Sequence, residues 1–303
     1  MTDAGQEGPQ PTSVLQPEGF RTVSPLPSEA ELADFYANVY FQKVPTTTYR
    51  HEYSDDETAF KRLRASLTIA LAKEKLKPAQ TKRLLDVGFG EGFELAAASE
   101  AGFEVRGIDF ATDGVGRFHP ELLAVVEARD PYARLVEISR GQERFDVCVL
   151  KSVLEHVRDP RKYLDLIRTI LDPEGVVVVT LPNDYSALQR ELLARGLCER
   201  EYWFAPPQHL QYFNTDNFGE FAASANYRVL DMVGDFPIEF FLFHPGSNYT
   251  RDAALGPAAH RARVIIDLLI ARRSMPNYVN LARAYAASGI SRTFTAYLRP
   301  IQN

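Results

Sequence analysis

Three glycines stand close together in the stretch RLLDVGFGEGFEL, which covers residues 83–95. Gly88, Gly90 and Gly92 follow a short apolar run and precede a pattern typical of a helix. Glycines at such a turn let backbone N–H groups approach a ligand where any Cβ would clash. Asp109 follows about 20 residues later, after a second apolar run, where a carboxylate can bind both hydroxyls of a ribose. These residues predict a nucleotide-type cofactor site.

The spacing of the glycines differs from that of a dinucleotide-binding loop. The fingerprint G-x-G-x-x-G would place its third glycine at Phe93, and Glu91 lies inside the loop. A carboxylate there is a poor neighbour for a pyrophosphate and a tolerable one for a cationic ligand. The loop therefore disfavours a nicotinamide dehydrogenase.

The elements that would position these residues alternate as in a doubly wound sheet. The apolar runs RLLDVGF, FEVRGIDF, ARLVEIS, FDVCVLK and GVVVVTLP predict strands, and helical patterns lie between them. Runs that are apolar throughout suit strands covered on both faces. The alternation predicts a parallel α/β sheet, with YRVLDMV and SRTFTAYLRP as its last strands.

The rest of the chain predicts additions to this core. Residues 1–28 carry five prolines among polar residues, which predicts a flexible tail. Residues 29–80 predict two helices, and residues 236–289 predict a mostly helical cap insertion before the final strand in 290–303. The core itself then spans residues 81–235.

Together these motifs resemble class I S-adenosylmethionine-dependent methyltransferases. LLDVGFGEGFEL is similar to motif I of that family, and the resemblance extends through GIDF, FDVCVLKSVLEHVRDP and LDPEGVVVVTLPND. It implies a Rossmann-like, doubly wound, mostly parallel sheet of seven strands with an antiparallel last strand and helical cap elements. It also implies S-adenosyl-L-methionine as the cofactor.

The resemblance assigns roles around this cofactor. Gly88, Gly90 and Gly92 would bracket its methionine portion, Asp109 would hold the ribose, and Phe110 would pack against the adenine. The expected cofactor-binding set also includes three residues beside these positions or at a later strand end, Asp86, Glu91 and Lys151.

In similar enzymes the N-terminal helices lie over the cofactor, which makes residues 29–80 a lid. Tyr49 and Tyr53 are then candidate substrate-binding residues, and helix packing is the alternative. Asp184 and Tyr212, after the fifth predicted strand, are further candidates for substrate binding.

Methyl transfer from a sulfonium needs alignment of the reacting atoms and, for a hydroxyl acceptor, removal of a proton. A positioned base contributes about 10²- to 10⁴-fold. His209, behind two prolines and among aromatic residues, is the candidate base, because an apolar surround keeps an imidazole neutral. His156 is the second catalytic candidate. Alternatively, His209 fixes its loop and His156 packs at the start of a helix.

A metal is not expected from the sequence. Some quinone-pathway O-methyltransferases that resemble this region carry an acidic residue where Ser152 stands, and a metal role is suggested for them. Because this chain lacks that acid, we predict no metal.

Composition excludes several partners. A net charge of −6 without a long Lys/Arg cluster argues against a nucleic-acid surface. No apolar run approaches the roughly 20 residues of a membrane span, and the first residues lack the pattern of a signal peptide, so a cytoplasmic location is expected.

The expected function is O-methylation of a small-molecule or sugar- or glycan-linked acceptor. N- or C-methylation of a small metabolite remains an alternative, as does a protein that binds the cofactor without catalysis. Lys151-Ser152-Val153 stands where a nucleobase amino-methyltransferase would carry a Pro-Pro-Tyr type element. The sequence leaves the oligomeric state open.

Overall fold

The computed structural model describes residues 10–35, 52–77 and 82–302. A seven-stranded sheet lies at its centre, in the order β5-β4-β3-β6-β7-β10-β9. Strands β3 to β7 pair in parallel, whereas β10 runs antiparallel to both β7 and β9. The fold confirms the predicted Rossmann-like sheet with an antiparallel last strand. The strands are β3 (Arg83–Val87), β4 (Glu104–Asp109), β5 (Val126–Ala128), β6 (Phe145–Lys151), β7 (Leu171–Pro182), β9 (Tyr227–Gly234) and β10 (Thr293–Pro300).

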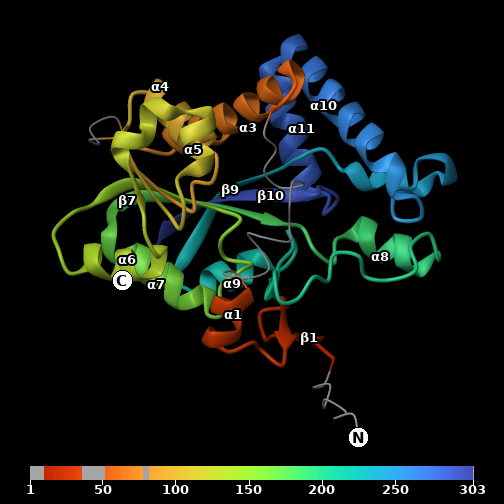
Figure 1. Cartoon of the computed structure of the whole chain (residues 1–303), viewed down its shortest axis with the longest axis horizontal. Helices are drawn as coiled ribbons and strands as arrows, with labels where there is room; N and C mark the ends of the chain where they lie inside the picture. Colours follow the sequence, from red (N-terminus) through yellow and green to blue (C-terminus); the bar gives the residue numbers. More distant parts are fainter. Residues whose placement is uncertain (1–9, 36–51, 78–81, 303) are drawn as a thin grey trace, which may run out of the picture.

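Helices cover both faces of the sheet (Figure 1). One face packs against α3 (Asp55–Glu74), α4 (Phe93–Glu100), α5 (Asp113–Phe118), α10 (Gly256–Arg273) and α11 (Met275–Ala287). The other face packs against α6 (Pro131–Ser139), α7 (Pro160–Ile170) and α9 (Phe218–Ser224).

Strand β6 shows why the central runs are apolar throughout. Val147 and Val149 pack in one hydrophobic core, and Cys148 and Leu150 pack in the other. Because side chains alternate between faces along a strand, a strand buried on both sides favours apolar residues at successive positions. Asp146 is the buried exception in β6, and its Oδ2 atom accepts a hydrogen bond from the Arg83 N–H at 2.7 Å. Cys148 and Cys198 are both free and buried.

The run ARLVEIS forms part of helix α6, so its prediction as a strand is wrong. The Asp130 side chain caps this helix by accepting a hydrogen bond from the Ala133 N–H at 2.9 Å, and Pro131 occupies its first turn. Leu135 and Ile138, three residues apart, are buried on one face. A short apolar run is compatible with either a strand or a helix, and here the capping residue Asp130 and Pro131 favour the helix.

The flexible tail predicted for residues 1–28 is contradicted where the structure describes it. Strands β1 (Thr12–Leu15) and β2 (Arg21–Ser24) form an antiparallel hairpin, and β2 pairs with β8 (Gln211–Tyr212) in a second sheet. Phe20, at the hairpin, stacks on Phe213 with ring centroids 4.7 Å apart. Amino-acid composition could not predict the hairpin, because the hairpin is held in place by contacts with residues distant in the sequence.

Helices also lie in the segments before and after the predicted core, among the residues that the structure describes. Helix α1 (Glu29–Phe35) begins after Ser28, whose hydroxyl accepts a hydrogen bond from the Glu31 N–H. Helix α3 contacts α4 and α10, and α11 contacts β9, so the segment between β9 and β10 also covers the sheet. In the described ranges, no helix has the length and apolar character required to cross a bilayer. Shorter helices are η2 (Pro120–Val125), α8 (Ala187–Ala194), η3 (Ile238–Phe243), η4 (Pro245–Ser247) and η5 (Ala253–Leu255).

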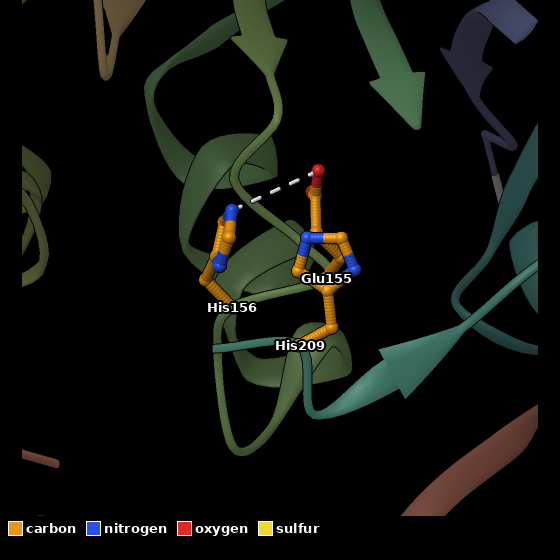
Figure 2. Close-up of side chains that lie close together, drawn as sticks. All are labelled: Glu155, His156 and His209. Carbon is orange, nitrogen blue, oxygen red and sulfur yellow. Dashed lines mark ion pairs between the residues drawn. The ribbon is translucent and has the colours of Figure 1, made fainter. Parts of the chain in front are cut away.

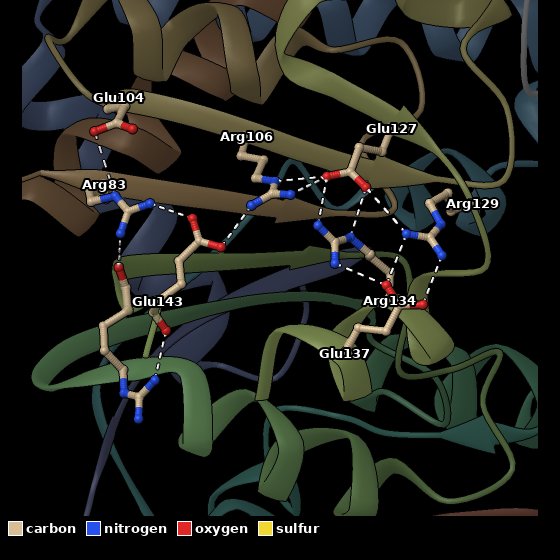
Figure 3. A network of polar contacts seen from close by, with 9 residues as sticks. Arg83, Glu104, Arg106, Glu127, Arg129, Arg134, Glu137 and Glu143 are labelled. Atoms are coloured by element: carbon tan, nitrogen blue, oxygen red, sulfur yellow. Dashed lines mark hydrogen bonds and ion pairs between the residues drawn. The ribbon is translucent and has the colours of Figure 1, made fainter. Parts of the chain in front are cut away.

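A network of ion pairs joins β3, β4 and β5 to α6 (Figure 3). Glu127 of β5 accepts a hydrogen bond from Arg134 Nε at 2.8 Å and also pairs with Arg106 of β4. Glu143 pairs with Arg106 at 2.8 Å and with Arg83 at 2.5 Å. Because Arg83 begins β3, the network extends toward the amino ends of these strands.

Candidate cofactor and acceptor site

The loop after β3 holds the three predicted glycines in left-handed conformations. The φ angles of Gly88, Gly90 and Gly92 are 78°, 53° and 82°. A Cβ at Gly88 would lie 2.9 Å from the side chain of Val153, and one at Gly92 would lie 2.5 Å from that of Val115. Only glycine fits this tight turn without displacing a neighbour.

Asp109, at the carboxyl end of β4, is bonded directly to this loop. The Gly90 N–H donates a hydrogen bond to Oδ2 of Asp109 at 2.8 Å, and the Phe110 N–H donates to Oδ1 at 2.6 Å. Burial raises the pKa of Asp109 above its usual value, and these backbone hydrogen bonds oppose the rise without cancelling it. Each carboxylate oxygen can accept a second hydrogen bond, so the side chain remains able to bind ribose hydroxyls.

A cavity of about 470 Å³ lies at the carboxyl ends of the central strands. Gly88, Asp109 and the 60% exposed Phe110 line one part of it. The start of α6 faces the same cavity through Asp130, Pro131 and Tyr132, and Lys151 lines it from the end of β6. The carboxylate of Asp109 and the exposed ring of Phe110 fit the nucleoside portion of S-adenosylmethionine, and the tight glycine turn leaves room for its methionine portion.

Sequence reasoning missed the contribution of Asp130 and Tyr132. Because ARLVEIS was interpreted as a strand, the residues before it were not placed at the carboxyl edge of the sheet. The missed signal is Asp130-Pro131, a capping residue followed by a proline suited to the first helical turn.

Four residues of the predicted cofactor set are not among the described residues that line this cavity: Asp86, Gly90, Glu91 and Gly92. Asp86 is buried in β3, where burial and then the charge of Glu94 raise its pKa well above the usual range. Glu91 accepts hydrogen bonds from Tyr53 Oη at 2.6 Å and from Lys61 Nζ at 2.7 Å. Glu91 is thus paired with side chains of the N-terminal helical segment. Lys151, another member of the predicted cofactor set, forms an ion pair with Glu94 of α4.

Glu155, His156 and His209 come together at the same cavity (Figure 2). Their ligand-type atoms all lie within 4.8 Å of one another, and His156 Nε2 is 3.8 Å from Glu155 Oε1. The two imidazole centroids are 5.0 Å apart. The loop after β6 supplies the first two residues, and the loop before β8 supplies the third.

Burial sets the protonation of this cluster. It raises the pKa of Glu155 to about 8 and lowers the pKa of His156. Burial, assisted by the charges of His156 and Arg292, lowers the pKa of His209 to about 3. His209 is therefore neutral near pH 7, as the apolar surround predicted, but an imidazole with so low a pKa is a weak proton acceptor.

Asp184 and Tyr212 lie behind His209. The Oδ2 atom of Asp184 is 4.0 Å from His209 Nδ1, and its Oδ1 atom is 3.7 Å from an Arg292 nitrogen. Burial raises the pKa of Asp184 to about 7, although Arg292 opposes this rise. Tyr212 donates a hydrogen bond to the His209 carbonyl at 2.8 Å and accepts one from the Ala205 N–H at 3.2 Å. These contacts orient His209 and its loop, and neither side chain is among the described residues that line the cavity.

The two candidate tyrosines before the glycine loop differ in status. Tyr49 lies outside the described residues. Tyr53 lines a neighbouring cavity of about 420 Å³, which shares Lys151 and Ser152 with the first. This second cavity also receives three basic side chains from α3 and α10, Lys61, Arg64 and Arg263.

The fold and the cofactor loop define a class I S-adenosylmethionine-dependent methyltransferase. The defining features are the antiparallel last strand and the glycine turn bonded to the acid at the end of the next strand. The methyltransferase-domain family matches residues 56–231, more than half of the chain, and the chain belongs to this family.

Several curated relatives are ubiquinone biosynthesis O-methyltransferases. The chain is 30% identical to the one from Bordetella avium over 202 residues, covering 61% of this chain and 78% of the relative. It is 27% identical to the one from Paraburkholderia phymatum over 161 residues, or 50% of this chain and 67% of the relative. A 36% identical match in Cereibacter sphaeroides spans 109 residues, 35% of this chain and 43% of the relative.

Solved structures share the fold at low identity. The 1,6-didemethyltoxoflavin-N1-methyltransferase of Burkholderia thailandensis, bound to S-adenosylhomocysteine, gives a TM-score of 0.50 at 14% identity, covering 96% of this chain and 99% of that one. A plantazolicin methyltransferase with the same ligand type gives 0.50 at 14% identity, covering 89% and 94%. The family match confirms the predicted enzyme class, which uses S-adenosylmethionine as its cofactor, and these structures confirm the predicted fold.

Proposed function

We propose that this methyltransferase transfers the methyl group to a hydroxyl of a small-molecule acceptor. One observation carries the proposal: the cavity lined by Gly88 and Asp109 is also lined by Glu155, His156 and His209. Cofactor-binding groups and polar groups able to handle a proton therefore face one space. The relatives named ubiquinone biosynthesis O-methyltransferases support an oxygen acceptor.

In this proposal the two parts of the cavity have separate roles. Asp109 binds the ribose hydroxyls, and Phe110 and Tyr132 flank the adenine. Gly88 allows the backbone to approach the methionine portion. Binding in this position directs the reactive end of the cofactor toward the Glu155–His209 side.

The polar cluster binds and orients the acceptor hydroxyl, whose proton leaves to solvent as the methyl group is transferred. When bound, S-adenosylmethionine supplies a methyl group that bonds to the acceptor oxygen while the C–S electron pair remains on sulfur. Alignment by Glu155, His156 and His209 provides the proximity on which such an in-line displacement depends.

The cavity favours a compact and partly apolar acceptor. Its volume of about 470 Å³ falls within the ~300–1,000 Å³ range of small-molecule sites, and the cofactor occupies part of it, which leaves a small space for the acceptor. Apolar walls come from Val153, Val157, Tyr163 and Pro182. A phenolic ring places its flat face against such walls and its hydroxyl toward polar groups, so phenols are the proposed acceptor class.

The test is an acceptor panel analysed by mass spectrometry. The chain is incubated with S-adenosylmethionine and, separately, with catechol-type phenols, sugars and primary amines. We expect S-adenosylhomocysteine to form with a phenol, whose mass increases by one CH₂ unit. Methylated sugars would reassign the acceptor to glycans, and methylated amines would overturn O-methylation. Cofactor binding without transfer to any class would indicate a binding protein.

A further inference from the structure

The imidazole of His156 is held in one tautomer by the backbone. Its Nδ1 atom lies 2.6 Å from the carbonyl oxygen of Gln208. A carbonyl oxygen only accepts hydrogen bonds, so Nδ1 carries the hydrogen and Nε2 carries a lone pair. That Nε2 atom faces Glu155 Oε1 at 3.8 Å. His156 thus presents an electron pair, and no hydrogen, to the carboxylate.

His209 is oriented in the same sense from the opposite loop. Its Nδ1 atom is the one near Asp184, 4.0 Å from the carboxylate oxygen Oδ2. The other ring nitrogen turns toward Glu155 and His156 (Figure 2). The carbonyl behind His156 holds the hydrogen on Nδ1 and leaves Nε2 available to a ligand. In His209, Nδ1 has no hydrogen-bond partner among the described residues, and Nε2 is turned toward the other two side chains (Figure 2).

The third member, Glu155, is 1% exposed. Among the residues described, none hydrogen-bonds to its Oε2 atom. This carboxyl group and the two imidazoles place three possible metal-ligand atoms within 4.8 Å of one another. Buried charges are stable when they are paired or when they coordinate a metal, so this arrangement suits a cation at its centre.

We propose that Glu155, His156 and His209 form a binding site for a divalent transition-metal ion such as Zn²⁺. One carboxylate oxygen and two Nε2 atoms would be the ligands. Zinc bonds of about 2.0–2.2 Å place tetrahedral ligand atoms roughly 3.3 Å apart. The three atoms lie within 4.8 Å of one another, so small side-chain rotations close the site.

The surroundings match those of metal-binding histidines. Such histidines donate their other ring N–H to a carbonyl or a carboxylate, which fixes the ring and raises its basicity as a ligand. Gln208 provides this carbonyl for His156, whereas the carboxylate nearest to His209 Nδ1, that of Asp184, lies 4.0 Å away, beyond hydrogen-bonding distance.

Three protein ligands leave a fourth position open, as in catalytic zinc sites. Because all three side chains line the cavity that contains Asp109, the open position faces the space for the acceptor. The acceptor hydroxyl would then be the fourth ligand, a role that rests on the proposed function. A bound cation lowers the pKa of such a hydroxyl, whose proton leaves to solvent.

The sequence predicted no metal because Ser152 replaces an acid in the KSVLEH element. The fold changes this expectation by adding a ligand from another segment. His209 lies on the loop before β8, and only the packing of that loop against the end of β6 brings it to Glu155.

The test measures Zn²⁺ binding to the full chain after treatment with a chelator and dialysis. We expect calorimetry to show one saturable equivalent of Zn²⁺ in the wild type. Glu155→Gln and His209→Ala should each weaken binding by at least about tenfold, because even groups that only orient a metal ligand contribute that much. His244→Ala, which removes an exposed histidine outside the cavity, should bind as the wild type does.

Co²⁺ serves as a second probe, since its visible absorption should change when the site fills and should be lost in His209→Ala. Equal S-adenosylhomocysteine affinity in all variants verifies folding, and His156→Ala replaces any variant that fails this check.

No saturable Zn²⁺ binding, or equal binding in the wild type and both ligand variants, would overturn the site. Transfer to a phenol by the metal-free chain alongside absent Zn²⁺ binding would refute only this inference. Zn²⁺ binding without transfer to any acceptor would refute only the proposed function.

Discussion

At the scale of single residues, Asp109 connects the glycine loop to the cofactor. Removing its carboxylate takes away a partner of the Gly90 N–H and the proposed partner of the ribose. Hydrogen bonds to charged groups contribute about 1.5–3 kcal/mol. We therefore expect Asp109→Ala to weaken S-adenosylhomocysteine binding by about 10- to 100-fold in calorimetry.

Asp113→Ala is the matched control, because it removes an exposed carboxylate on α5. It should leave the affinity close to that of the wild type. Unchanged affinity in Asp109→Ala would show that the cofactor binds elsewhere.

His209 belongs to the acceptor side of the cavity. We expect His209→Ala to reduce turnover by about 10²-fold or more, since it removes a group that positions the hydroxyl or assists its proton loss. The affinity for S-adenosylhomocysteine should remain unchanged, as separate binding and steady-state measurements would show. A fully active His209→Ala variant would remove this residue from the mechanism.

The sequence could predict those site residues whose spacing is local. Gly88, Gly90 and Asp109 lie in one strand–loop–helix unit and its next strand, and the structure joins them as the motif implies. The meeting of Glu155 with His209 could not be predicted, because it depends on how two separate loops pack.

At the scale of elements, the N-terminal hairpin anchors to the core through Phe20. This side chain is 6% exposed and contacts the rings of Phe213 and Phe221, with centroids 4.7 Å and 5.3 Å away. We expect Phe20→Ala to lower the free energy of unfolding by about 3 kcal/mol. Urea denaturation would measure the loss.

Leu15→Ala provides the control on the same hairpin, because Leu15 is 60% exposed. Its effect should stay within about 0.5 kcal/mol. Equal small effects of both substitutions would show that the hairpin does not stabilise the core.

The network around Glu127 predicts a pH-dependent contribution to stability. Burial raises the pKa of Glu127, but hydrogen bonds from Arg134 and Arg106 outweigh burial and leave the pKa lowered. A carboxylate with a lowered folded pKa stabilises the protein above its unfolded pKa of about 4.3, and this contribution disappears as the pH falls through the folded value.

We therefore expect Glu127→Gln to lower the Tm most clearly near pH 7. The difference from the wild type should shrink below about pH 4, as thermal scans across pH would show. A difference that grows toward acid would contradict the sign of this linkage.

Sequence patterns predicted most elements because both faces of the sheet are buried, which makes its strands apolar throughout. They were wrong for residues 133–139, where a capped helix contains a short apolar run. They were also wrong for β1 and β2, whose order depends on pairing with β8 and on a single buried phenylalanine.

At the scale of the whole molecule, parallel pairing places the carboxyl ends of β3, β4 and β6 at one edge of the sheet. The cavity forms at this edge, and the loop before β8 closes over it with His209. The Glu127 network crosses β3, β4 and β5, and none of its described residues lines this cavity. Ligand binding at the carboxyl ends of the strands is usual for open α/β folds.

The most direct measurement follows an isotope-labelled methyl group from S-adenosylmethionine to a catechol-type phenol, with the product identified by mass spectrometry. We expect a labelled methyl ether from the wild type and from His244→Ala, and little product from Asp109→Ala or His209→Ala. Label on nitrogen or carbon, or equal yields of ether from all four proteins, would contradict O-methylation in this cavity.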